Sequence, residues 1–337
     1  MPTTHLTPTT VITGFLGSGK TTLLNALLRH PALEDTAVLV NEFGDVGIDH
    51  LLVDELDDEA IVLLNAGCLC CTIRNDLVGA LSDLRTRRAR GEIPPFRRVV
   101  IETTGLADPA PILHTLLSHE ALTDDFRVDG IVTTVDGLHG ERQLDQNIES
   151  VKQAAVADRI VLTKTDLAGD TTTLRERLRA INTTASVLEA VSGDIEPAKL
   201  LDTGLFNLHD KPPEVTEWLR AVDQDGWSPD NGHHHRHDDG IASFYLEASQ
   251  PLAIHRFVTW IERLLETEGE RVLRLKGVLD VEGSDAPIVV HGVQHVFHPL
   301  TQLSRWPDES RRSQIVLIGR ELDEHAVRSS FDAAVVG

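Results

Sequence analysis

The residues from Gly14 to Thr21 have the spacing of a phosphate-binding loop, G-x-x-x-x-G-K-T. The glycines let successive backbone N–H groups surround a di- or triphosphate, and the N-terminus of the following helix adds partial positive charge. Lys20 is expected to reach the β- and γ-phosphates, and the Thr21 hydroxyl to ligate Mg²⁺. An apolar stretch precedes the loop and a leucine-rich stretch follows it, which disfavours the alternative of a glycine turn without a ligand. The predicted nucleotide contacts here are Gly14, Gly17, Ser18, Gly19, Lys20, Thr21 and Thr22.

A second candidate site is Glu102-Thr103-Thr104-Gly105, directly after the apolar residues 99–101. P-loop proteins place a carboxylate here that holds Mg²⁺ directly or through water, and the Gly105 N–H is expected to contact a γ-phosphate. That contact exists with a triphosphate and is lost after hydrolysis, which is the basis of a nucleotide switch. The predicted catalytic residues are therefore Lys20, Thr21, Glu102 and Gly105. An ordinary turn at a strand end is the alternative.

Thr163-Lys164-Thr165-Asp166 is similar to the guanine-reading N-K-x-D pattern, with Thr163 in place of Asn. A carboxylate at Asp166 accepts hydrogen bonds from both guanine N1–H and the N2 amine, which adenine does not offer. The stem of Lys164 can cover the ring. Thr163, Lys164 and Asp166 therefore favour GTP over ATP. The alternative interpretation is a solvated turn.

The chain has three cysteines, and Cys68, Cys70 and Cys71 lie within four residues. An odd, clustered set is not a disulfide framework. Because the thiols precede a predicted helix, their pKa values are expected to be low, which favours thiolates that bind Zn²⁺. Glu42 is the candidate fourth ligand, with a histidine as its competitor. Three inert core cysteines are the alternative.

A short histidine tract is formed by His233, His234, His235 and His237. Neutral imidazoles there are expected to gather a divalent metal weakly, and a solvated linker without a function is given equal weight. For His291 and His295, which share a predicted strand face, ordinary packing is favoured.

The elements that position these motifs are apolar strands alternating with helices. Strands are predicted at 36–40, 61–64, 99–101, 131–132 and 160–162, after the strand that leads into Gly14. This alternation indicates an α/β fold, a doubly wound, mostly parallel sheet of the P-loop NTPase type. Every motif above except the histidines follows a strand, and the carboxyl ends of parallel strands meet at one edge where ligands bind. A nucleotide site and a thiol site are therefore expected to be neighbours.

Three segments are predicted along the chain: a GTPase domain at 1–208, a linker at 209–240 and a smaller α+β domain at 241–337. The linker is polar and proline-containing, with a short helix expected around Glu214–Val222. The last domain is predicted to have strands at 243–248, 273–281, 288–297 and 314–318, an amphipathic helix from Ile254, and a closing helix to about Phe331.

The bulk composition describes an acidic globular protein. Its 337 residues include 31 Lys and Arg against 53 Asp and Glu, for a net charge of −22. Such a surface repels nucleic acid and anionic lipid, so neither is an expected partner. No apolar run approaches the roughly 20 residues of a membrane span, and no secretory signal is recognisable. A cytoplasmic location is predicted.

With these motifs, the chain resembles the CobW-type metallochaperone GTPases. The resemblance rests on G-F-L-G-S-G-K-T-T-L-L-N, N-E-F-G-D-V-G-I-D, G-C-L-C-C-T, E-T-T-G-L-A-D-P and T-K-T-D, on a histidine-bearing linker, and on W-P-D and I-V-L-I-G near the C-terminus. It implies GTP hydrolysis with phosphate release, coupled to delivery of a transition metal, often zinc, to a client protein. It also implies that the metal site lies at Cys68, Cys70 and Cys71.

The preferred hypothesis is a zinc-handling GTPase that uses Mg²⁺ and GTP and holds zinc in one nucleotide state. Cobalt delivery for corrin synthesis or to a cobalt enzyme is an alternative, because thiolate and imidazole ligands accept both ions. A non-catalytic metal buffer or sensor is an alternative of another class. A small-molecule kinase is least favoured, because it leaves the thiol cluster unexplained. A homo-oligomer is left open.

Overall fold

The computed structural model describes residues 6–42, 61–65, 73–201, 240–306 and 311–336. The chain divides into two compact units, Met1–Leu174 with Val187–Thr203, and Arg175–Ser186 with Gly204–Gly337. The helix predicted around Glu214–Val222 lies outside the described residues. Within the described ranges, no helix combines the length and the apolarity that a membrane crossing requires.

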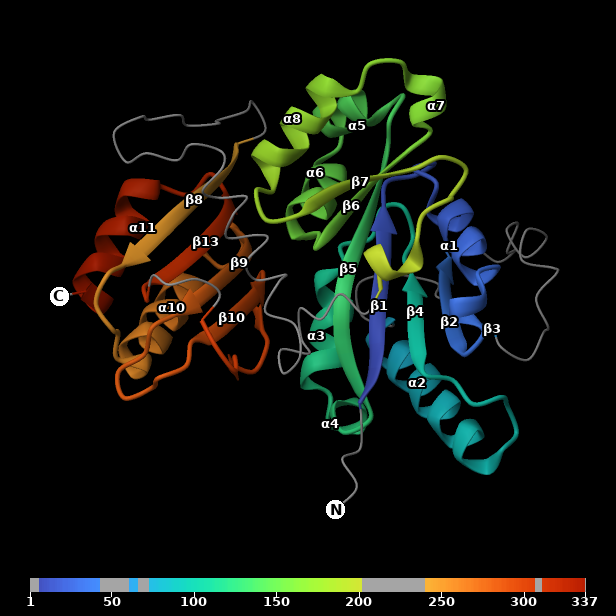
Figure 1. Ribbon diagram of the computed structural model, residues 1–337, viewed down its shortest axis with the longest axis horizontal. Coiled ribbons are helices and arrows are strands. Elements are labelled where there is room, and N and C mark those ends of the chain that lie inside the picture. Colours follow the sequence, from blue (N-terminus) through green and yellow to red (C-terminus); the bar gives the residue numbers. More distant parts are fainter. Residues whose placement is uncertain (1–5, 43–60, 66–72, 202–239, 307–310, 337) are drawn as a thin grey trace. The chain divides into compact units, whose positions relative to one another are not determined.

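The first unit is built on a seven-stranded sheet with the order β3-β2-β4-β1-β5-β6-β7 (Figure 1). All the strand pairs from β3 to β6 are parallel, as predicted from the alternation of strands and helices. The switch in strand order around β1 is typical of a doubly wound sheet, whose ligands bind beyond the carboxyl ends of the strands. The strands are β1 (Thr7–Gly14), β2 (Thr36–Glu42), β3 (Ile61–Asn65), β4 (Arg98–Glu102), β5 (Phe126–Asp136), β6 (Arg159–Thr163) and β7 (Ser186–Ala190).

Helices cover this sheet because its strands are apolar on both faces. On one face, Leu23 and Leu27 of α1 pack in one buried cluster with Ile12 of β1. The neighbouring residue Val11 is equally buried on the opposite face. The helices of this unit in chain order are α1 (Lys20–Leu28), α2 (Ile73–Arg90), α3 (Ala110–Ser118), α4 (Glu120–Thr123), α5 (Gly140–Gln146), α6 (Ile148–Val156) and α7 (Thr165–Ala168), with 3₁₀ turns at Pro31–Leu33 and Pro197–Lys199. Helix α8 (Thr172–Ile181) begins in this unit, and from Arg175 on its residues are assigned to the second unit.

Strand β7 was not predicted from the sequence. Its residues, S-V-L-E-A, are partly exposed except for Ala190, and the strand lies at the edge of the sheet. An edge strand with a serine and a glutamate lacks the continuous apolar run that marks the central strands. Strand β5 was predicted only at 131–132, whereas it extends over Phe126–Asp136.

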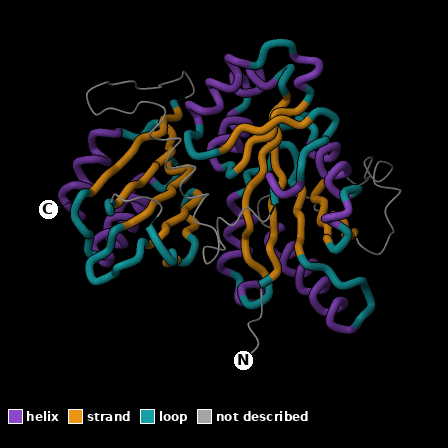
Figure 2. The backbone as a smooth tube through the Cα atoms, in the orientation of Figure 1, coloured by secondary structure: helices purple, strands orange, loops and turns teal. Residues whose placement is uncertain are grey.

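The second unit contains a smaller antiparallel sheet with helices (Figure 2). One face of this sheet carries Leu275 and Ile315, which pack in one cluster with Trp260 and Phe331. The Trp260 and Phe331 rings meet edge to face, with centroids 5.0 Å apart. Its elements are β8 (Ile241–Ala248), α10 (Ile254–Glu268), β9 (Val272–Leu279), β10 (Ile288–Val293), β11 (Val296–Phe297), β12 (Thr301–Gln302), β13 (Ser313–Arg320), α11 (Glu324–Phe331) and a π-helical turn at Asp332–Val336.

The predicted single strand at 288–297 is wrong. Strand β10 pairs with β9 as expected, but the chain then turns so that Val296 pairs back with Val293. Gln294 adopts φ 51°, a left-handed conformation that closes a tight turn. His295 therefore lies in this turn and does not share a strand face with His291, which is buried in β10 with 5% of its surface exposed.

Candidate nucleotide-binding site

A glycine and four polar residues stand at the carboxyl ends of parallel strands of the first unit. Strands β1, β2, β4, β5 and β6 end at Gly14, Glu42, Glu102, Asp136 and Thr163. Because these strands are parallel, the five residues lie along one edge of the sheet. The sequence motifs for phosphate, magnesium and guanine are therefore brought together at one edge of this sheet.

The loop from Gly14 to Gly19 needs glycine at its two ends. Gly14 has φ 143°, and a Cβ added there would collide with Thr134. Gly19 precedes the first residue of α1 with φ 90°, in the left-handed region that other residues rarely adopt. Helix α1 therefore begins at Lys20, with its N-terminus and the loop's backbone at the sheet edge.

Lys20 is held across this loop. Its Nζ donates hydrogen bonds to Gly14 O at 2.9 Å and Phe15 O at 3.1 Å, and only 8% of the residue is exposed. Ser18 Oγ and Thr134 Oγ1 lie 2.6 Å apart and tie the loop to β5. A nearly buried ammonium beside a helix N-terminus is a site suited to an anion such as a phosphate.

Thr21 and Glu102 form the junction between the loop and β4. The Thr21 hydroxyl donates to Glu102 Oε1 at 2.7 Å, and Glu102 is 4% exposed. A hydroxyl and a carboxylate are the oxygen ligands that Mg²⁺ accepts, so the pair fits this ion. Beyond Glu102, Gly105 lies so close to the loop that a Cβ added there would be 2.7 Å from Leu16 N.

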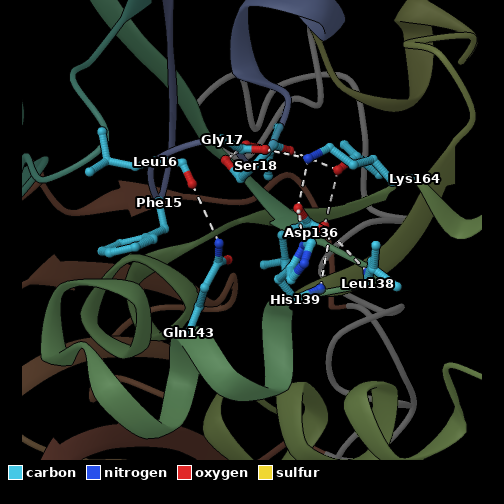
Figure 3. A network of polar contacts seen from close by, with 12 residues as sticks. Phe15, Leu16, Gly17, Ser18, Asp136, Leu138, His139, Gln143 and Lys164 are labelled. Atoms are coloured by element: carbon cyan, nitrogen blue, oxygen red, sulfur yellow. Dashed lines mark hydrogen bonds and ion pairs between the residues drawn. The ribbon is translucent and has the colours of Figure 1, made fainter. Parts of the chain in front are cut away.

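The predicted guanine-reading residues are tied to the same loop. Thr163 Oγ1 donates to Ser18 O at 2.7 Å. Lys164 Nζ donates to Gly17 O at 2.7 Å (Figure 3). Lys164 adopts φ 53°, the left-handed conformation of a residue preceding the short helix α7. Asp166 stands in the first turn of α7, where it is exposed.

Asp136, at the end of β5, is a site residue that sequence reasoning missed. Its Oδ2 accepts from Lys164 Nζ at 2.7 Å, and its Oδ1 accepts from Leu138 N at 2.8 Å and His139 N at 3.1 Å (Figure 3). Burial alone would raise the pKa of Asp136, but these hydrogen bonds and the Lys164 charge lower it below its ordinary value. The available signal was Asp136-Gly137 after an apolar stretch, which marks a strand end like those already assigned.

The predicted transition-metal ligands are mostly outside the described residues. This holds for Cys68, Cys70, Cys71 and for His233, His234, His235 and His237. Glu42 is the last residue of β2, and its backbone is in register with Asn65 of β3. In the part of the chain that the structure describes, no group of three or more His, Cys, Asp or Glu residues is arranged to hold a metal ion.

Comparison with known families agrees with the fold. The nucleotide-binding domain model of the CobW/HypB/UreG group matches residues 8–189. The model described as the Cobalamin synthesis protein cobW C-terminal domain matches residues 241–335. The chain belongs to the CobW family.

Relatives within the CobW family match the chain over nearly its whole length. The zinc chaperone YjiA of Escherichia coli is 36% identical over 322 residues, covering 96% of each chain. The zinc-regulated GTPase metalloprotein activator 1 of Schizosaccharomyces pombe is 29% identical, covering 94% of this chain and 82% of its own. The crystal structure of zinc-bound YjiA GTPase from Escherichia coli superposes with a TM-score of 0.72 at 33% identity, covering 98% of this chain and 99% of that one.

Proposed function

We propose that this protein is a GTP-hydrolysing zinc chaperone in which the bound nucleotide controls zinc held at Cys68, Cys70 and Cys71. The observation that carries the proposal is the single sheet edge at which β1, β4 and β6 end in the phosphate, magnesium and guanine motifs. Strand β3 ends at the same edge, three residues before Cys68. The names of the relatives, zinc chaperone and zinc-regulated GTPase, support the same assignment.

At the phosphate end, Lys20 moves its hydrogen bonds from the loop carbonyls to the β- and γ-phosphates when nucleotide binds. Thr21 and Glu102 would hold Mg²⁺, and the ion would supply positive charge that neutralises the phosphates. The Gly105 N–H donates to the γ-phosphate and loses this partner after phosphate release. A water-activating group is not assigned to this chain, so hydrolysis is expected to be slow without a partner protein.

At the base end, Asp166 accepts from guanine N1–H and the N2 amine, and the Lys164 stem covers the ring. The tether from Lys164 Nζ to Gly17 O fixes the distance between the base-reading turn and the phosphate loop. A nucleotide that binds both the base-reading turn and the phosphate loop must therefore carry guanine as its base.

The register of β2 and β3 supports a zinc site close to this edge. Glu42 pairs with Asn65, so β2 and β3 end side by side. Three residues of extended chain span at most about 10 Å, which limits the distance of Cys68 from Asn65. Strand β3 lies three positions from β1 in the sheet, a separation of about 14 Å at about 4.8 Å per strand. Glu42 is the proposed fourth zinc ligand. The histidine tract is proposed to gather metal more weakly.

Neighbouring sites allow the two ligands to affect each other's binding. GTP and Mg²⁺ order the loops at the sheet edge, and hydrolysis releases them, so zinc is held in one state and passed to a client protein in the other. Linkage requires that zinc changes nucleotide affinity by the same factor by which nucleotide changes zinc affinity. Equal GTP affinity with and without zinc would contradict the coupling.

The decisive experiment measures zinc affinity by competition with a chromophoric chelator, once with GDP and once with a non-hydrolysable GTP analogue. We expect at least a tenfold difference between the two states, about 1.4 kcal/mol of coupling. The difference should disappear in the Cys68, Cys70, Cys71→Ser variant. A variant with His233, His234, His235 and His237 changed to Gln is the matched control, and it should retain the difference.

Two outcomes would overturn the proposal. Tight zinc binding that is indifferent to nucleotide would indicate a metal buffer or a structural site. Zinc binding that survives the cysteine substitutions unchanged would show that the thiols are not the ligands.

Cobalt is a second candidate cargo, because the C-terminal family model is named for cobalamin synthesis. The same titration with Co²⁺ distinguishes the two ions. Stronger nucleotide dependence for cobalt than for zinc would favour it, and the thiolate–cobalt absorption would report the ligand set directly.

A further inference from the structure

Gln153 is a buried glutamine on α6 that no motif singled out. Only 1% of the residue is exposed, among alanines and valines of the same helix. Its Nε2 donates to Gly105 O at 3.2 Å and to Ala107 O at 3.0 Å. Both amide hydrogens are thus used on the loop that follows Glu102.

These contacts orient the peptide groups around Gly105. The carbonyl of Gly105 is held by Gln153, while the carbonyl of Thr104 accepts from Ala107 N at 3.1 Å. Because a peptide group is planar, fixing the Thr104 carbonyl also fixes the direction of the Gly105 N–H. Close packing of Gly105 against Leu16 places this residue beside the phosphate loop.

The amide of Gln153 lowers the stability of the fold at this position. Its Oε1 is buried and has no hydrogen-bond partner. Leaving a buried acceptor unpaired lowers stability, so such a group calls for an explanation. A leucine would fill a similar volume without an unpaired atom, but it would leave the Gly105 and Ala107 carbonyls without these donors. The two hydrogen bonds that Gln153 donates to the loop therefore explain why a glutamine is present at this position.

Helix α6 itself is anchored to the sheet at the same residue. Thr133 Oγ1 donates to Gln153 O at 2.8 Å, which satisfies one of the last carbonyls of the helix. Thr133 lies in β5, next to Thr134, which contacts the phosphate loop through Ser18. The glutamine is thus held rigidly with respect to β5, and the Gly105 loop is held with respect to the glutamine.

We propose that Gln153 is a positioning residue that holds the Gly105–Ala107 loop so that the Gly105 N–H meets a γ-phosphate, and that it thereby sets the preference of the site for GTP over GDP. This inference rests on the role proposed above for the Gly105 N–H. Gln153 does not touch the nucleotide. It holds the carbonyls of Gly105 and Ala107, and the N–H of Ala107 in turn holds the Thr104 carbonyl, whose peptide group carries the Gly105 N–H.

The test compares two variants of the full-length protein. Gln153→Leu removes both donors, and Gln153→Glu keeps the shape but turns carboxylate oxygens toward two carbonyls. Dissociation constants for GDP and for a non-hydrolysable GTP analogue are measured with Mg²⁺ present, together with kcat and KM for GTP. We expect the analogue-to-GDP affinity ratio and kcat each to fall about tenfold, while GDP affinity stays within threefold.

Val151→Ala is the matched control, because Val151 is also 1% exposed on α6 and makes none of these hydrogen bonds. It should lower the thermal unfolding temperature and leave the affinity ratio unchanged. If Gln153→Leu fails to fold, Gln153→Glu carries the test. An unchanged ratio, or an equal loss for both nucleotides, would overturn the positioning role. A wild-type protein that releases no phosphate from GTP with any metal or client protein would instead refute the proposed function. An unchanged affinity ratio in Gln153→Leu, with a wild type that does hydrolyse GTP, would refute this inference alone.

Discussion

The two ends of the nucleotide edge are held together in different ways. At the phosphate end, Lys20 bonds to carbonyls only six and five residues earlier in the chain. At the base end, Thr163 and Lys164 reach Ser18 and Gly17 across 145 and 147 residues. The Lys20 contacts are thus local, and long-range bonds from Ser18 to Thr134 and from Thr21 to Glu102 only add to them. The side-chain contacts of Thr163 and Lys164 at the base end are all long-range, and they exist only because β1, β5 and β6 are neighbours in the sheet.

This difference predicts how each end responds to substitution. A change in the phosphate loop removes a group that meets the ligand, so its effect on the nucleotide is direct and large. A change at Asp136 removes a group that holds the Lys164 side chain in place. Its effect on nucleotide binding is therefore indirect and smaller.

Lys20→Ala is expected to lower GTP turnover roughly 10²–10³-fold, because a nearly buried cation aimed at the phosphates is lost. The measurement is phosphate release at saturating Mg²⁺, with GTP binding followed by a fluorescent analogue. Lys199→Ala, at an exposed lysine, is the control and should match the wild type. A loss below threefold in Lys20→Ala would show that the loop does not meet the phosphates.

Asp166→Asn is expected to weaken GDP binding about 100-fold, because a charged acceptor of two guanine hydrogen bonds is lost. The new amide can donate to the C2 carbonyl of xanthine while still accepting from N1–H. Xanthosine diphosphate should therefore bind the variant more tightly than GDP does. Competition against a fluorescent nucleotide measures both affinities, and an unchanged GDP affinity would remove Asp166 from the base site.

Asp136→Asn is expected to weaken GDP binding about tenfold, through loss of the charge that holds Lys164. A double-mutant cycle with Lys164→Met isolates the pair, and the two losses should be less than additive. Full additivity would mean that Asp136 acts independently of Lys164. In that case the two ends of the site would not differ in the way proposed.

Acidification is expected to have the smallest and most specific effect. The pKa of Asp136 is lowered from its ordinary value of 3.8, so its stabilising contribution is complete above that value and is lost as the pH falls through the lower folded-state pKa. The urea unfolding free energy of wild type minus that of Asp136→Asn should therefore be larger at pH 7 than near pH 3. A difference that is constant with pH would contradict an ionised, paired Asp136.

Much of the fold was predictable because its signals are local. Apolar runs mark β2, β4 and β6, and the glycine and lysine spacing at Gly14–Thr21 marks the loop and the start of α1. Strand β7 escaped because an exposed edge strand lacks such a run. The turn at Gln294 escaped because glutamine seldom adopts a positive φ, so the residue type does not signal it.

The sequence by itself determined the phosphate loop, the strand ends that carry Glu102 and Thr163, and membership of a family built on these motifs. The tertiary structure alone decided that Asp136 would hold Lys164 and that Gln153 would hold the Gly105 loop. The physical reason lies in the range of the forces. Backbone dihedral preferences and glycine spacing act over a few residues and can be read along the chain. Hydrogen bonds between residues far apart in the sequence depend on the order and register of the strands, which a local pattern does not specify.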